Sequence, residues 1–159
     1  MRRRNFLLLA LLLLLAAWLP AGAEDTPEQL RARLAAETDL IRKARLAVRL
    51  AELELEGARK DYAGGDWDKG KAGLEQMLGY VEQAYTHLTE THRDPRRKPS
   101  GFKDTEIKLR VFLRRLEDLR SSLPLDERPV VEKVVASVRE IQQDLLEGVL
   151  RVKTKKKEE

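Results

Sequence analysis

Few side chains in this sequence are of the types that perform catalysis or ligate metals. Its 159 residues include no cysteine and only two histidines, which excludes thiol catalysis, iron–sulfur clusters and cysteine-ligated zinc. His87 and His92 are five residues apart, and on a helix this spacing points them about 140° apart, not onto one face. The Glu-x-x-His pattern of di-iron bundles and the Gly-x-Ser-x-Gly turn of hydrolases are absent from the sequence. We therefore expect no metal, no cofactor and no enzyme activity.

The densest carboxylates are Glu52, Glu54 and Glu56. Glu52 and Glu56 share a helix face, with Lys60 four residues further on, and such pairs support a solvated helix by roughly a few tenths of a kcal/mol. Paired catalytic carboxylates would need a cleft, which a narrow helical bundle does not offer. Met77 lies on an apolar stripe, so we expect it to pack in the core and not to ligate a haem.

The feature that stands above this background is a cluster of cations in the middle of the chain. Pro95, Pro99 and Gly101 predict that the segment from Thr91 to Phe102 is a loop. Either this loop is a solvated linker, or it contacts an anionic surface: phospholipid headgroups, an acidic cell-wall polymer or an acidic protein. Phe102 either inserts at such a surface or packs under the start of the next helix. The candidate contact residues, called here the basic cluster, lie within 11 residues and are opposed only by Asp94: Arg93, Arg96, Arg97, Lys98 and Lys103.

The first 23 residues have the three parts of a secretory signal peptide. Arginines at positions 2–4 precede the unbroken 14-residue apolar run Phe6–Leu19, and Ala21-Gly22-Ala23 follows Pro20. The run is shorter than the ~20 residues that span a bilayer, which favours cleavage over a retained membrane anchor. We therefore expect cleavage between Ala23 and Glu24 and a periplasmic or secreted protein.

Removal of residues 1–23 changes the charge balance. The chain has 31 basic and 27 acidic residues, and loss of three arginines lowers the net charge from +4 to +1. Residues 24–90 carry 10 basic and 14 acidic side chains, whereas residues 91–120 carry 10 and 5. A near-neutral exported protein is not expected to bind nucleic acid.

The rest of the chain predicts four helices in one domain, residues 24–152, followed by a charged tail, residues 153–159. Thr26, Pro27 and Gln29 predict a helix start with a capping box, and Gly64-Gly65 an end at Ala63. The other predicted helices run from an Asp66 cap to Glu90, from Asp104 to Ser122, and onward from an Asp126 cap. In the third helix we expect six inward residues: Ile107, Leu109, Phe112, Leu113, Leu116 and Leu119.

The fold class expected from this pattern is all-α, an antiparallel four-helix bundle with a long first helix. The first helix either breaks near Thr38-Asp39 or projects past the bundle. Its apolar line through Leu30, Leu34 and Ile41 does not skip, which favours one continuous helix. Leucines on a projecting stretch would need a partner, so a homodimer through the first helix is a further expectation.

The segment from Tyr62 to Gly70 resembles the turn of a tetratricopeptide repeat, in which a tyrosine precedes a Gly-Asp-aromatic-Asp step between two helices. Ala58, Gly70 and Leu74 match the small and large positions of that family, and the match covers about residues 57–78. The resemblance implies a helical hairpin of similar crossing geometry. No second copy occurs in the chain, and a peptide-binding solenoid needs at least ~3 copies. Independently, Ala51 and Ala58 opposite Gly70 and Gly73 predict a close approach of the two helices.

These observations predict an exported helical-bundle interaction or scaffold protein of the bacterial cell envelope. The alternative is a carrier of a small ligand or cofactor, with a pocket in the bundle core.

Overall fold

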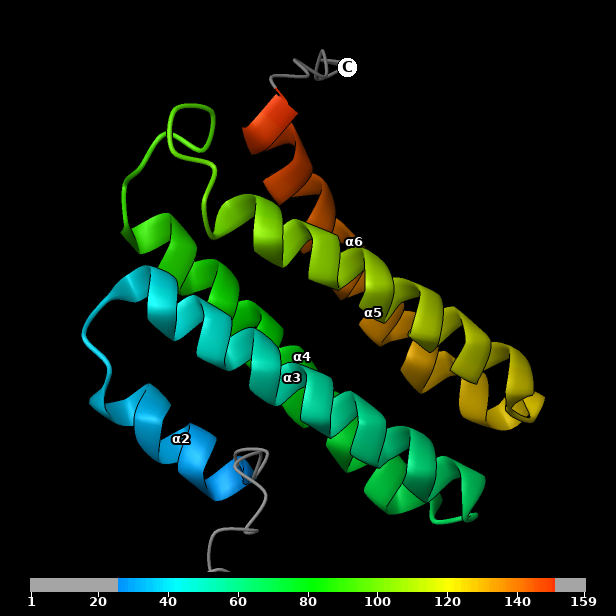
Figure 1. Ribbon diagram of the computed structural model, residues 1–159. Helices are drawn as coiled ribbons and strands as arrows, with labels where there is room; N and C mark the ends of the chain where they lie inside the picture. Colours follow the sequence, from blue (N-terminus) through cyan, green and yellow to red (C-terminus); the bar gives the residue numbers. More distant parts are fainter. Residues whose placement is uncertain (1–25, 151–159) are drawn as a thin grey trace, which may run out of the picture.

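The computed structural model describes residues 26–150, and this part of the chain is all-helical (Figure 1). The predicted signal peptide and charged tail lie outside it. The described residues form five α-helices and one short 3-10 helix, and none of them is in a strand. The helices are α2 (Pro27–Ala36), α3 (Leu40–Ala63), α4 (Trp67–Glu90), α5 (Phe102–Ser122) and α6 (Arg128–Leu150), with the 3-10 helix η1 (Leu125–Glu127) before α6.

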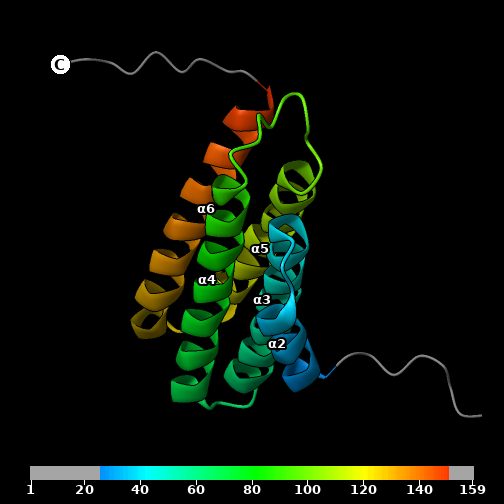
Figure 2. The same ribbon diagram turned by 90° about the vertical axis from the view of Figure 1, so that its left-hand side faces the viewer.

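The four long helices form two hairpins that pack on each other (Figures 1 and 2). Helices α3 and α4 make the first hairpin, and α5 and α6 make the second. Between the hairpins, α4 contacts α6 and α3 contacts α5, while α2 packs on α3. Phe112 and Met77 are completely buried in the apolar core, together with a set of aliphatic residues: Leu50, Leu55, Leu74, Val81, Leu88, Leu109, Leu116, Val131 and Val138.

The expectation of one long first helix is wrong, because α2 ends at Ala36 and α3 begins at Leu40. The carboxylate of Glu37 accepts hydrogen bonds from the backbone N–H groups of Thr38 (2.8 Å) and Asp39 (2.9 Å). These bonds lower the pKa of Glu37 and hold the chain in a turn. The carboxylate of Asp39 then caps α3 by accepting from the N–H of Arg42 at 2.8 Å. The side chains of Glu37 and Asp39 therefore end α2 and begin α3 within three residues.

Because of this break, α2 folds back along the bundle (Figure 1). Leu30 and Leu34 are buried in the same core cluster as the other helices, as the capping box at Thr26 positions the start of α2. Arg31 donates hydrogen bonds to the hydroxyl of Tyr80 (3.0 Å) and to Glu54 (2.8 Å). Leu30 and Leu34, which were expected to project, are buried within the same chain. They are therefore not available for the expected homodimer contact.

The close approach of α3 and α4 is confirmed at one pair of small residues. A β-carbon added at Gly73 would lie 3.0 Å from the β-carbon of Ala58. At Gly70 a β-carbon would lie 2.6 Å from the ring of Tyr62. The Tyr62 ring also lies beside that of Trp67, with 5.8 Å between the ring centroids. The glycines therefore let the two helices meet near their connecting turn.

Three details of the second hairpin differ from the prediction. Helix α5 begins at Phe102, two residues earlier than expected, after Gly101 with a φ of 87°. Ile107, expected inward, is 42% exposed. Asp126 does not occupy the cap position of the last helix, because it lies inside η1, two residues before α6 begins at Arg128. Arg128 instead ties this corner by donating to the carbonyl of Leu123 at 3.0 Å.

Candidate functional site

The basic cluster lies mainly on the loop between α4 and α5, and Asp94 organises that loop. The Asp94 carbonyl accepts hydrogen bonds from the backbone N–H groups of Arg97 (3.2 Å) and Lys98 (3.0 Å). Its carboxylate accepts from the N–H of Arg96 at 3.0 Å. Three cations are therefore carried on a folded turn and not on an extended linker.

The loop is also held at both ends. Thr91 donates its hydroxyl to the carbonyl of Leu88 at 2.6 Å, which extends the end of α4. A β-carbon at Gly148 would lie 3.4 Å from the ring of Pro95, so the loop rests against the last turns of α6. Lys103 stands apart from the turn, in the first turn of α5, where its N–H donates to the carbonyl of Pro99 at 3.0 Å.

All five side chains of the basic cluster are exposed. The Arg97 guanidinium lies 3.8 Å from the Asp94 carboxylate, and the Arg97 side chain is 88% exposed. Within residues 26–150 the side chains of the other four have no ion pair or hydrogen bond: Arg93, Arg96, Lys98 and Lys103. The cluster therefore presents positive charge that the described part of the protein does not neutralise.

Phe102, at the edge of the cluster, is not available to an external surface. It is 4% exposed and belongs to the hydrophobic core. The preceding Gly101 is wedged against Ile41 and Leu88, where a β-carbon would lie 3.0 Å from Ile41 and 3.1 Å from Leu88. Phe102 thus fastens the start of α5 to the core, which was the second of the two roles considered for it.

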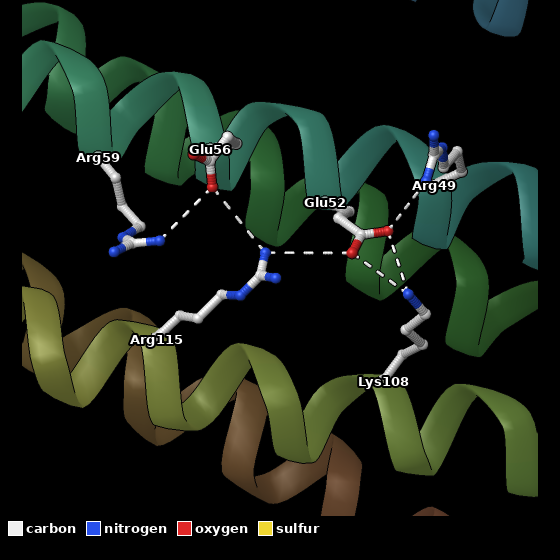
Figure 3. A network of polar contacts seen from close by, with 6 residues as sticks. All are labelled: Arg49, Glu52, Glu56, Arg59, Lys108 and Arg115. Carbon is white, nitrogen blue, oxygen red and sulfur yellow. Dashed lines mark hydrogen bonds and ion pairs between the residues drawn. The ribbon is translucent and has the colours of Figure 1, made fainter. Parts of the chain in front are cut away.

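Glu52 and Glu56 of α3 form ion pairs with cations other than the basic cluster (Figure 3). The Glu52 carboxylate lies 3.2 Å from Lys108 Nζ and 3.4 Å from an Arg49 nitrogen. Arg115 of α5 bridges Glu52 (4.0 Å) and Glu56 (3.9 Å). The ion pairs of Lys108 and Arg115 cross from α5 to α3, and such a network is worth more than isolated surface pairs. The two carboxylates face four cations in this network, since Arg59 also approaches Glu56, so they have no charge left for the basic cluster.

A buried polar contact joins α5 to α6. Glu106 is 3% exposed, and Gln142 Nε2 donates a hydrogen bond to its Oε1 at 2.6 Å. Arg110 lies 2.8 Å from the other carboxylate oxygen. A charge removed from water in this way requires such partners. This contact was not anticipated from the sequence, and it aligns the two helices of the second hairpin.

The histidines are separated by the structure as well as by the sequence. His87 is half-buried on α4, with neither ring nitrogen hydrogen-bonded and Nδ1 3.6 Å from Glu90. His92 is exposed in the loop with a φ of 50°. Within residues 26–150 no three His, Cys, Asp or Glu side chains are grouped so that they could hold a metal ion. In the same part of the chain, no helix is long and apolar enough to cross a membrane.

Comparison with protein-family models, with curated proteins and with solved structures finds no match for this chain. The interpretation of the basic cluster therefore rests on its own residues and geometry.

Proposed function

We propose that this protein is an exported helical-bundle interaction or scaffold module of the bacterial cell envelope, periplasmic or secreted, which binds an anionic surface through the basic cluster. The four long helices serve as an antiparallel four-helix core, and the α3–α4 hairpin keeps the crossing geometry implied by its tetratricopeptide resemblance. The observation that carries the proposal is the combination of an ordered loop backbone with exposed cations that lack ion-pair partners in residues 26–150.

The expected binding is weak and reversible. Each Lys or Arg near an anionic membrane contributes at most ~1 kcal/mol, so five contribute ~5 kcal/mol before the cost of ordering. That cost is reduced here, because Asp94 already holds the turn and Pro95 already rests against α6. The remaining loss is the rotamer freedom of the long side chains themselves.

The test is sedimentation with vesicles that contain anionic phospholipid, using matched charge reversals. The variant Arg96→Glu with Lys98→Glu is compared with Lys60→Glu with Lys133→Glu, a pair of exposed cations on α3 and α6 outside the cluster. Both variants change the net charge equally. Loss of binding in the first variant alone supports the proposal. Equal loss in both would show attraction by net charge and would contradict a specific site.

The alternative function, a small-ligand carrier, has one observation in its favour. A hollow of about 470 Å³ lies between the turn regions of the two hairpins, at the end of the bundle and not in its core. Its lining includes the neighbouring rings of Tyr62 and Trp67, whose planes are tilted by 54°, with Arg59 and Asp118. An absorbance spectrum of protein purified from its native host tests this alternative, because a bound haem or pigment would add bands above the aromatic absorption. A spectrum without such bands removes coloured cofactors from consideration.

A further inference from the structure

Helix α5 presents an outward face that combines cations with one exposed aliphatic side chain, that of Ile107. Lys103, Ile107, Arg110 and Arg114 are spaced by four, three and four residues, so they share one side of the helix. Ile107 is 42% exposed, one of three large hydrophobic residues in positions 26–150 that are exposed. The other two, Leu125 and Leu150, lie in η1 and at the last described position of α6.

This face is not covered by another element. A surface hollow on it is lined by residues of α5 alone: Ile107, Arg110, Val111, Leu113 and Arg114. The opposite side of α5 is the one that packs into the bundle, through Leu109, Phe112 and Leu116. The outward face is therefore available to a partner along the first three turns of the helix.

The charges of the face continue those of the loop. Lys103 belongs to both the basic cluster and the α5 face. Lys103 and Arg114 have no ion pair within the part of the chain that the structure describes, and Arg110 pairs with Glu106, which also receives Gln142. Loop and helix thus form one positive surface, bordered on α5 by an aliphatic strip of the exposed Ile107 and the half-buried Val111.

We propose that the outward face of α5 lies flat on an anionic phospholipid bilayer. Ile107 and Val111 enter the boundary between headgroups and acyl chains, while Lys103, Arg110 and Arg114 contact lipid phosphates. An amphipathic helix with basic residues around an apolar strip binds membranes in this way. The inference rests on the proposed function and makes it more specific. It favours lipid over a soluble acidic polymer, because a bilayer offers an apolar phase to the exposed isoleucine and such a polymer does not.

The direct test uses a single tryptophan as a depth probe. In the exported protein, from which Trp18 is removed with residues 1–23 by the expected cleavage, Trp67→Phe combined with Ile107→Trp places the only indole on the face. On addition of vesicles containing phosphatidylglycerol, we expect its emission to shift to the blue and to be quenched by brominated acyl chains. The control is Ala72→Trp in the same background. Ala72 is exposed like Ile107, but it lies on α4, which packs on α3 and α6 and is not part of the proposed contact. Its emission should change little.

A second measurement covers the case in which tryptophan itself drives insertion. Ile107→Ser should weaken vesicle binding by about fivefold. This is the loss expected when the 42% of the isoleucine surface that is exposed in the free protein no longer gains from transfer out of water. Leu125→Ser, in η1 beyond the end of α5, should leave vesicle binding unchanged. Both sites are exposed, so circular dichroism should report an intact fold.

The outcomes separate the two proposals. Vesicle binding that is lost with the loop charges but unaffected at Ile107, with no blue shift, would overturn the α5 contact and leave the loop as the site. Equal binding to soluble polyglutamate, again without a shift, would identify an acidic polymer and overturn the membrane contact. Absence of any binding by the wild-type protein would overturn the proposed function together with this inference.

Discussion

Gly70→Ala should destabilise the protein, although alanine is the better helix former. The added β-carbon would lie 2.6, 2.7 and 2.9 Å from three carbons of the Tyr62 ring, distances at which something must move. Tyr62 is 3% exposed and its ring is tilted against Trp67 with 5.8 Å between ring centroids, so relief of the clash requires this buried pair to shift toward the hollow that both residues line. Gly79, on the same helix, provides the matched control, because a β-carbon there meets nothing within 4 Å.

The magnitudes follow from two opposing terms. Replacing a helical glycine by alanine stabilises by up to ~1 kcal/mol, and Gly79→Ala should gain most of this. At Gly70 the same gain is offset by overpacking, which costs ~1–3 kcal/mol. The two variants should therefore differ by ~1–3 kcal/mol in the free energy of unfolding, with Gly79→Ala more stable than wild type and Gly70→Ala less stable.

Thermal unfolding followed by far-ultraviolet circular dichroism measures this difference. For a domain of this size, 1 kcal/mol corresponds to about 4 °C in the melting temperature. Gly79→Ala should melt a few degrees above wild type and Gly70→Ala below it. If Gly70→Ala rises by as much as Gly79→Ala, the ring of Tyr62 is free to move and the argument from close packing is refuted.

Two further predictions concern buried polar groups. Gln142→Ala should lower the free energy of unfolding, measured by urea titration, by ~1–3 kcal/mol, because the Glu106 carboxylate loses a buried donor. The control is Gln143→Ala at the exposed neighbouring position, which should leave the free energy of unfolding unchanged. Burial, and secondarily the charge of Glu127, raise the pKa of Tyr62, so the folded state favours the neutral phenol. Titration of Tyr62 should therefore leave the free energy of unfolding constant below about pH 10. Above that pH, the free energy of unfolding should fall as the pH rises. Tyr62→Phe should reduce this alkaline loss, and an identical pH profile in the variant would contradict the assignment.

The sequence predicts those parts of the fold that local side chains decide. The capping box at Thr26 and the cap at Asp66 both form, because their donors and acceptors lie within three residues of each other. A break near Thr38-Asp39 is one of the two alternatives that the sequence leaves open, yet the apolar spacing favours a continuous helix, although Glu37 and Asp39 act equally locally. The seven-residue spacing of Leu34 and Ile41 survives the break, since both residues still reach the core, and periodicity alone therefore did not reveal it.

The positions that depend on packing between distant segments were less predictable. Exposure of the loop cations follows from Pro95, Pro99 and the charges themselves. The contacts of Glu52 with Lys108 and of Glu106 with Gln142 instead join residues 56 and 36 positions apart along the chain. The expectation that Ile107 faces inward conflicts with its spacing, because it lies two positions before the buried Leu109, which is about 200° around the helix. That angle was available from the sequence and indicates the outward face.

The measurement that tests the central claim most directly is vesicle sedimentation of the exported protein at two salt concentrations. With anionic vesicles at about 0.1 M salt the protein should sediment, and at about 1 M it should be released, because the Debye length falls from ~10 Å to ~3 Å. Reversal of Arg96, Arg97 and Lys98 to glutamate should abolish binding at low salt and leave the circular dichroism spectrum and melting temperature unchanged. A wild-type protein that fails to sediment at either concentration, together with a lower melting temperature in the reversed variant, would show that the basic cluster stabilises the fold and does not bind an external surface.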